Sequence, residues 1–345
     1  MRHIDRAFLH SVRAGWKISW MRIGFTFLVW FWIWFGLSAC DERTEERGDA
    51  AQHTKEGSSE HRFSPSRVVS LLPSNTELVA ALSATDRLIG VTSNDTYPPE
   101  VVQLPKVGDM TINGEAVLLL KPDLVLASPY QEDVVALLRR SGVPVLVVPE
   151  AHRLTDIVDA LYEVGQAIGA EEKARDVQAH LTTLLEMYPL REGEQNDGPR
   201  VWLEIAPPPE LYTAGGDTFL GEAIHRAGGR GLADAQSGWP LWSMEDVLAN
   251  NPDMIFLLHH GDLDLSAEKA DDVSRHAPVR QASRETMERL AKRPGFSQLT
   301  ALQKGNVYML DEDIFSRPAP RLIEALPSLA EVIEAVKNDA VKERP

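Results

Sequence analysis

Two glutamates stand at matching places in two similar segments of this chain. Glu115 is followed seven positions later by Pro122-Asp123 and an apolar run, and Glu245 is followed at the same spacing by Pro252-Asp253 and another apolar run. In each copy the pattern predicts a short helix that begins near the acid, followed by a buried strand. A helix N-terminus stabilises a carboxylate, which by itself explains one such glutamate. A matched pair on two lobes also offers a partner a two-point electrostatic contact.

The residue types that support metal or covalent chemistry are sparse. His259-His260-Gly261-Asp262 places two histidines and an aspartate together after an apolar run. Adjacent side chains on an extended chain point to opposite sides, and neither a cysteine nor a third histidine stands at ligand spacing nearby. The chain contains no Gly-x-Ser-x-Gly element and no Gly-x-x-x-x-Gly-Lys loop. We therefore expect a non-enzymatic protein with neither a cofactor nor a metal site.

The charge balance excludes several classes of partner. The 345 residues include 35 Lys and Arg against 51 Asp and Glu, for a formal net charge of -16. This acid excess argues against nucleic acid and against an anionic membrane bound through a basic patch. A hydrophobic fraction of 43% is enough for two domains. The single cysteine, Cys40, excludes a disulfide within the chain.

The first residues are typical of an export signal. A basic start precedes the apolar run Ile23–Leu37, which is shorter than the roughly 20 residues that span a bilayer. It ends in Leu37-Ser38-Ala39-Cys40, which resembles the lipobox of bacterial lipoproteins. We predict a signal peptide over residues 1–39, acylation of Cys40 as the only membrane attachment, and a location outside the cytoplasmic membrane. An uncleaved anchor helix is the alternative, and Met21 is an alternative start.

Elements that could position the glutamates begin at Arg67, where short apolar runs alternate with helical stretches and predict α/β architecture. Residues 40–66 before it are too polar to fold and predict a flexible tether. The simplest fold is two lobes, residues 67–169 and 191–345, joined by a long helix within residues 170–190. The predicted strands are Val68–Leu72, Leu88–Val91, Leu124–Ala127, Val143–Val148, Arg200–Ile205, Met254–Leu258 and Val307–Leu310. Ser74 or Asn75 is expected to cap the first helix.

Helical spacing predicts the remaining elements. The predicted helices are Glu132–Arg140, Thr155–Tyr188 with a break at Gly169, a segment near Thr218–Ala227, and a final helix from Arg321. The composition of residues 262–293 predicts a polar insertion built around a helix at Ala282–Lys292. The sequence assigns no role to this insertion.

Several motifs of the chain belong together: Arg67–Ala84, Gly90–Pro99, Val107-Gly108-Asp109, Lys121–Val125, Gly238-Trp239-Pro240 and Arg317–Arg321. As a set they resemble one family, the substrate-binding proteins of ABC importers for cobalamin, haem and iron-siderophores. The resemblance covers residues 67–336 and is strongest to the cobalamin-binding branch, through the Tyr-Pro-Pro and Trp-Pro elements. It implies two Rossmann-like lobes bridged by a rigid helix, here Glu171–Tyr188, with the ligand in a cleft between the lobes.

The same resemblance implies a set of functional residues. The implied cleft residues are Pro73, Ser74, Asn75, Tyr97, Tyr212, Trp239, Asp313, Phe315 and Arg317, with Met110 and Tyr130 as apolar walls where the cobalamin branch often carries Trp. Aromatic faces of this kind suit a large, flat, partly polar ligand. Glu115 and Glu245 match the residues that dock onto the permease dimer, which works with its ATPase subunits.

The function expected from these motifs is capture of a corrinoid by a monomeric, lipid-anchored component of an ABC importer. The departures at Met110 and Tyr130 leave haem and ferric siderophores as alternative ligands. A signalling or structural lipoprotein that keeps the fold is the alternative of a different class.

Overall fold

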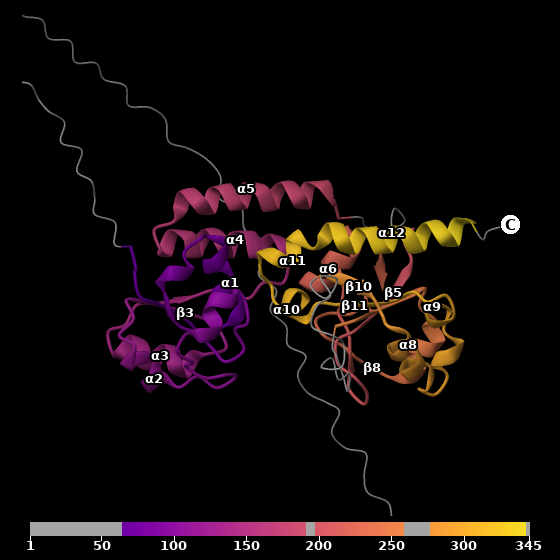
Figure 1. Cartoon of the computed structure of the whole chain (residues 1–345), viewed down its shortest axis with the longest axis horizontal. Coiled ribbons are helices and arrows are strands. Elements are labelled where there is room, and N and C mark those ends of the chain that lie inside the picture. Colours follow the sequence, from indigo (N-terminus) through magenta and orange to yellow (C-terminus); the bar gives the residue numbers. More distant parts are fainter. Residues whose placement is uncertain (1–63, 191–196, 259–276, 343–345) are drawn as a thin grey trace, which may run out of the picture. The chain divides into compact units, whose positions relative to one another are not determined.

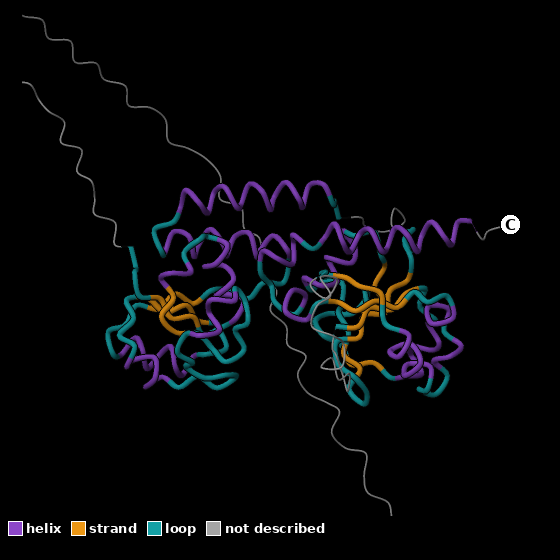
Figure 2. The backbone as a smooth tube through the Cα atoms, in the orientation of Figure 1, coloured by secondary structure: helices purple, strands orange, loops and turns teal. Residues whose placement is uncertain are grey.

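Two separate sheets organise the residues that the computed structural model describes, which are 64–190, 197–258 and 277–342 (Figures 1 and 2). The first sheet has the strand order β2-β1-β3-β4, and the second has the order β10-β11-β9-β5-β7. Every ladder in them is parallel except that between β10 and β11. A short antiparallel ladder joins β6 and β8. The predicted α/β class, with two lobes built on parallel sheets, is confirmed.

The first half alternates strands and helices before ending in two long helices. Its elements are β1 (Val68–Ser70), α1 (Pro73–Ala81), β2 (Leu88–Gly90), α2 (Gly114–Leu119), β3 (Leu124–Ala127), α3 (Glu132–Arg140), β4 (Val145–Val147), α4 (Leu154–Ala167) and α5 (Glu171–Met187). Short 3-10 turns occupy Thr85–Arg87 and Pro99–Gln103.

The second half repeats this alternation with more interruptions. Its elements are β5 (Arg200–Glu204), β6 (Leu211–Tyr212), α6 (Phe219–Arg226), β7 (Arg230–Gly231), β8 (Leu241–Trp242), α7 (Met244–Asn250), β9 (Met254–Leu257), β10 (Val279–Gln281), α8 (Arg284–Ala291), α9 (Thr300–Gln303), β11 (Val307–Leu310), α10 (Glu312–Phe315), α11 (Pro320–Glu324) and α12 (Leu326–Lys342). The predicted insertion therefore contributes the edge strand β10 and helix α8.

The predicted internal repeat is confirmed by the sheet order. The order β2-β1-β3-β4 of the first sheet corresponds to β7-β5-β9-β11 of the second, with β10 added at one edge. Helix α2 precedes β3 as α7 precedes β9, and Glu115 and Glu245 occupy the first turns of these two helices.

The Pro-Asp pairs of the repeat fix neighbouring strands to each other. The Asp123 carboxylate accepts hydrogen bonds from the backbone N–H groups of Ser66 and Arg67, at 2.9 Å each, just before β1. The Asp253 carboxylate accepts one from the Arg200 N–H at the start of β5, at 2.8 Å. Each aspartate thus joins the starts of two neighbouring strands, β1 and β3 in the first sheet and β5 and β9 in the second.

The residue before each Pro-Asp pair adopts the same unusual backbone conformation. Lys121 and Asn251 have φ values of 49° and 39°, in the left-handed region that side chains other than glycine rarely adopt. In the second copy this residue ends helix α7. The repeat therefore extends from sequence spacing to backbone conformation.

Helices α4 and α5 connect the cores of the two halves. Helix α5 packs along α4, and both contact α11 of the second half (Figure 1). One hydrophobic cluster contains Leu161 of α4, Leu181 of α5 and Leu322 of α11. The helix predicted at Glu171–Tyr188 is observed as α5, whereas the lobe boundaries 67–169, 170–190 and 191–345 stay predictions.

We expect Asp253→Asn to destabilise the protein by about 1–2 kcal/mol near pH 7, a value discounted for the partial exposure of this carboxylate. Burial opposes its ionisation, but the hydrogen bonds and charge of Arg200 outweigh burial and lower the pKa of Asp253. A lowered pKa contributes stability above the unfolded value of about 3.9 and loses it as pH falls through the folded value. The difference from wild type should therefore shrink below about pH 4.

Urea unfolding of both proteins between pH 3 and pH 7 measures this difference. Asp176→Asn, at an exposed position of α5, is the control and should change the free energy of unfolding by less than about 0.5 kcal/mol. A difference for Asp253→Asn that stays constant across this pH range would contradict the assignment.

Candidate ligand-binding site

An apolar pocket lies beside the carboxyl ends of strands from both sheets. Its volume is about 390 Å³, within the range of small-molecule sites. The first half lines it with Leu72, Ser74, Asn75, Leu78, Ser128, Pro129, Tyr130, Val148, Pro149, Glu150 and Ala151, and the second half with Ile205, Phe219, Leu220, Trp239, Leu258, Ser316 and Pro318. Ligands of open parallel sheets generally bind at these strand ends, because the loops there converge.

A second, more polar pocket of about 870 Å³ adjoins the first. The two share Leu72, Ser74, Ser128, Tyr130, Ser316 and Pro318. We call the two pockets together the cleft.

Most of the residues predicted to line a ligand cleft are found there. Ser74, Asn75, Tyr130 and Trp239 line the apolar pocket, and Pro73, Met110, Asp313 and Arg317 line the polar one. Three do not line either pocket. Phe315 is 1% exposed and packs in the core, Tyr212 lies in the β6–β8 ladder, and the Tyr97 ring lies 3.9 Å from the guanidinium carbon of Arg321.

Ser74 and Asn75 reach the pocket from the first turn of α1, and not from the capping position that the sequence predicted. Helix α1 begins at Pro73, after Leu72 as N-cap, and no side chain caps it. The prediction that Ser74 or Asn75 caps the helix is wrong, because proline is favourable in the first helical position and starts the helix earlier. Both residues are therefore inside the helix, and Asn75 Nδ2 donates to the Ala127 carbonyl at 3.3 Å.

Gln131 holds the loop that carries Tyr130. Its side-chain oxygen accepts a hydrogen bond from the Ser128 N–H at 2.9 Å, while its amide donates to the Leu71 carbonyl at 2.9 Å. This joins the ends of β1 and β3. The Tyr130 side chain remains 76% exposed, and its phenol donates a hydrogen bond to the Glu150 carboxylate.

Trp239 is positioned by a loop fastened to the start of α6. The Gly238 N–H donates to Asp217 Oδ1 at 2.7 Å, and the Gly215 N–H donates to the Gly238 carbonyl at 2.8 Å. The hydrogen bond from Gly238 is the main cause of the lowered pKa of Asp217. The Trp239 ring meets Phe219 edge to face, with centroids 5.4 Å apart, and these two aromatics form one wall of the pocket.

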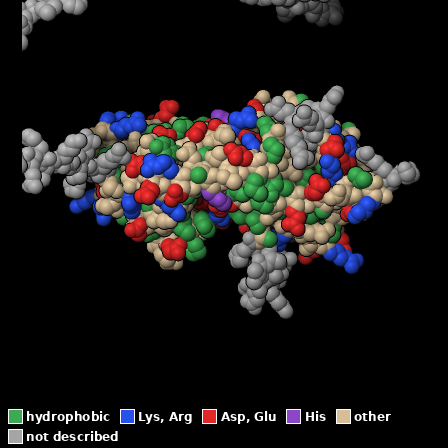
Figure 3. All heavy atoms as spheres, turned by 90° about the horizontal axis from the view of Figure 1, so that it is seen from above, with side chains coloured by type: hydrophobic (Ala, Val, Ile, Leu, Met, Phe, Trp, Pro, Cys, Tyr) green, Lys and Arg blue, Asp and Glu red, His purple; other side chains and the backbone are tan. Residues whose placement is uncertain are grey.

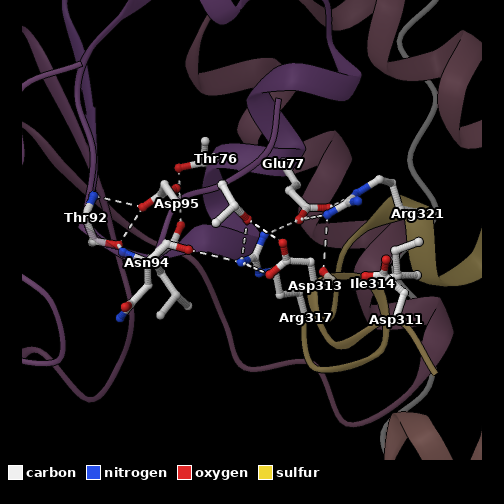
Figure 4. A network of polar contacts seen from close by, with 12 residues as sticks. Thr76, Glu77, Thr92, Asn94, Asp95, Asp311, Asp313, Ile314, Arg317 and Arg321 are labelled. Atoms are coloured by element: carbon white, nitrogen blue, oxygen red, sulfur yellow. Dashed lines mark hydrogen bonds and ion pairs between the residues drawn. The ribbon is translucent and has the colours of Figure 1, made fainter. Parts of the chain in front are cut away.

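A buried carboxylate links the two halves next to the cleft (Figure 4). Glu77 of α1 is 2% exposed, and burial of its charge is costly unless it is paired. It accepts a hydrogen bond from Arg317 at 3.1 Å and two from Arg321, at 2.8 Å and 2.5 Å. Burial disfavours the charge of Arg321, but Glu77 outweighs this effect and raises the pKa of Arg321.

The second guanidinium nitrogen of Arg317 is also fully engaged. Its Nη2 donates to the Asn94 carbonyl at 3.0 Å, to Thr96 Oγ1 at 2.9 Å and to Asp313 Oδ1 at 2.5 Å. Thr96 in turn donates to Asp313 Oδ2 at 2.7 Å. Arg317 thus borders the cleft, but its charge is matched by two carboxylates.

The predicted docking glutamates are exposed, and other residues cap their helices. Asn113 caps α2, and Ser243 with Asp246 forms a capping box on α7. Among the described residues, no hydrogen bond or ion pair of the Glu115 or Glu245 carboxylate is found. Leu119 of α2 and Leu241 of β8 are also exposed, at 81% and 59%. The caps leave both glutamates available to a partner.

Charge elsewhere on the surface is mixed. On the face shown in Figure 3, acidic and basic side chains are interspersed across the described part of the chain. Within residues 64–190, 197–258 and 277–342, no helix has the length and apolar character needed to cross a membrane. The same residues contain no cluster of three or more His, Cys, Asp or Glu that could hold a metal ion. The predictions on Cys40, the signal peptide, His259 and His260 lie outside the described residues.

Sequence reasoning assigned no role to four residues that build the site: Glu77, Glu150, Phe219 and Arg321. Only Glu77 gave a usable signal, because an acid next to Leu78-Val79 in a helix needs a buried partner. The role of the other three depends on tertiary contacts between distant segments.

Comparisons with known proteins agree with this architecture. A family model described as periplasmic binding protein matches residues 68–314. The ABC transporter substrate-binding lipoprotein YvrC of Bacillus subtilis is 35% identical over 284 residues, which are 78% of this chain and 80% of that protein. The vitamin B12-binding protein of Vibrio parahaemolyticus is 29% identical over 280 residues, 79% of this chain and 90% of that protein.

One of the similar solved structures is that of a haem-binding protein. The periplasmic haem-binding protein RhuT from Roseiflexus is 25% identical, with a TM-score of 0.64 over 78% of this chain and 98% of that one.

We expect Glu77→Gln to lower the free energy of unfolding by about 3 kcal/mol, because it takes from the partly buried Arg321 its carboxylate partner and leaves the buried Arg317 with Asp313 alone. Urea denaturation measures the loss. Glu324→Gln, at an exposed position of α11 next to the same network, should change the stability by less than about 0.5 kcal/mol. Equal effects of the two substitutions would show that Glu77 does not hold the arginines.

Proposed function

The chain belongs to the periplasmic binding protein family, and on that premise we propose that it captures a corrinoid for an ABC importer. The observation that carries the proposal is the cleft, whose apolar wall comes from both halves of the repeat. A ligand held there contacts both sheets at once. The family is one of substrate-binding proteins, and the proposal includes no catalytic step.

The chemistry of the cleft suits a large ligand that is apolar on its faces and polar at its edges. Trp239 and Phe219 offer aromatic surface, while the hydroxyls of Ser74, Ser128 and Ser316 offer hydrogen bonds at the boundary between the pockets. Met110 and Tyr130, 90% and 76% exposed, supply further apolar walls. A corrin ring with amide side chains has these faces and edges.

The names of the relatives support the same ligand. Vitamin B12-binding proteins of several bacteria match more than three quarters of this chain at 27–29% identity. Haem is the second candidate, favoured by the similarity to RhuT.

The proposal extends to a partner and a location. We place the mature protein outside the cytoplasmic membrane, anchored by a lipid on Cys40 and acting as a monomer; the relative YvrC is itself named a lipoprotein. Glu115 and Glu245 would dock onto basic residues of a permease dimer coupled to its ATPase subunits. Charge pairs of this kind speed the encounter and fix its register.

Titration of the purified protein with cyanocobalamin, haemin and a ferric siderophore tests the ligand. We expect one-to-one binding of cyanocobalamin, weakened about thirtyfold by Trp239→Ala because an aromatic wall is removed. Tyr212→Ala is the control, since Tyr212 is a partly exposed aromatic outside both pockets, and it should leave the affinity within about threefold. If only haemin or only the siderophore binds, that compound replaces the corrinoid as the assigned ligand. If none of the three binds, the signalling alternative is favoured.

Uptake by cells tests the partner. Glu115→Gln with Glu245→Gln should abolish corrinoid uptake and leave the affinity of the purified protein unchanged, because both side chains lie outside the cleft. Glu132→Gln with Glu334→Gln makes the same change of charge at exposed positions of α3 and α12 and should leave uptake normal. Normal uptake by the first pair would refute the docking role.

A further inference from the structure

Resting on the proposed function, we propose that Glu150 is a specificity-determining residue that admits amide-bearing ligands and repels ligands whose edge carries a carboxylate. It would therefore select a corrinoid over haem within one and the same cleft.

The position of Glu150 in the apolar pocket is the first observation. It is the only charged residue among the described residues that line this pocket. Its side chain is 40% exposed, so it lies at the rim, where the edge of a flat ligand emerges. No lysine or arginine among the lining residues offsets its charge.

The adjoining polar pocket adds no free positive charge. Its described lining includes Asp109, Glu312 and Asp313, and Arg317 is the one cation among them. Arg317 is bound to Glu77 and Asp313, so it is not available to an incoming carboxylate. The described lining of the cleft therefore offers no free cation to an incoming carboxylate.

Two side chains contact Glu150 and shape its role. The phenol of Tyr130 donates a hydrogen bond to its Oε2, and His152 Nε2 lies 4.0 Å from the same oxygen. His152 is 69% exposed and offsets the charge of Glu150 only when protonated. A neutral imidazole leaves the negative charge of Glu150 without an offset from this side.

The Tyr130 phenol is unsuited to bind ferric iron in this arrangement. The hydrogen bond to Glu150 is the main cause of the raised pKa of Tyr130, so the phenol keeps its proton. An iron-bound tyrosine is a phenolate, and Glu150 opposes its formation. Tyr130 instead acts as a donor that orients the carboxylate.

Glu150 would therefore discriminate between ligands by the charge at their edge. A side-chain amide of a corrinoid can donate its N–H to the free lone pairs of Glu150. A haem carboxylate at the same edge would meet a like charge and lose its own hydration. Such a repulsive element gives specificity without improving the contacts to the favoured ligand.

Cyanocobalamin and its monocarboxylic acids, in which one peripheral amide is hydrolysed, test this proposal most directly. The pair differs only in one charged group at the edge of the same ligand. Calorimetry at pH 8, where imidazole is neutral, would compare wild type, Glu150→Gln and Tyr130→Phe, with haemin as the second probe.

We expect wild type to bind at least one monocarboxylic acid about tenfold more weakly than cyanocobalamin, and Glu150→Gln to abolish this difference and strengthen haemin binding. Added salt should reduce the difference in wild type only, since it screens the repulsion. Tyr130→Phe keeps the charge of Glu150 and should keep the difference. Glu334→Gln, far from the cleft lining, should behave as wild type.

The outcomes separate this proposal from the proposed function. Failure of wild type to bind any corrinoid refutes both. Tight binding of cyanocobalamin with a discrimination that Glu150→Gln leaves unchanged refutes the role of Glu150 alone. Loss of the discrimination in Tyr130→Phe as well would assign it to the hydrogen bond rather than to the charge, and would also overturn the proposal.

Discussion

The interaction of Glu77 with Arg317 and Arg321 determines how the walls of the cleft face each other. Glu77 belongs to α1, which carries Ser74 and Asn75 to the pocket, whereas Arg317 stands between the lining residues Ser316 and Pro318. Buried ion pairs seldom add stability over apolar packing, because both charges lose their hydration. The geometric consequence is better defined: three hydrogen bonds hold one wall at a fixed distance from the other.

The internal repeat supplies a second tie at an equivalent place. Helix α6 is the first helix of the second half as α1 is of the first, and its Glu222 is also buried, at 3% exposure. It accepts a hydrogen bond from the Leu154 N–H at the start of α4, at 3.0 Å, and one from Arg226, at 2.7 Å. Arg226 also donates hydrogen bonds to two backbone carbonyls at the end of α5. Each lobe therefore uses one acid of its first helix to hold elements beyond its own sheet.

The sequence predicted those features that depend on local pattern or fixed spacing. Strand β3 and helix α3 match their predicted bounds, and the repeat gave the positions of Glu115 and Glu245. It did not predict directions that depend on tertiary packing. Phe315, the last residue of the 4-residue helix α10, is buried in the core, while Ser316 and Arg317, which follow the helix, line the cleft. Strands of 2 residues such as β6 and β8 carry too little periodicity to be recognised.

In a chain with a net charge of -16, the pairing of each acid distinguishes structure from function. Glu77, Glu222, Asp123 and Asp253 are matched by arginines or backbone N–H groups, and their removal would leave those donors unpaired. Glu115, Glu245 and Glu150 keep lone pairs for a partner or a ligand. Because an exposed carboxylate contributes little to stability, folding does not account for its placement on two matched helices or at the rim of an apolar pocket, and the proposed docking and selection by charge rest on that placement.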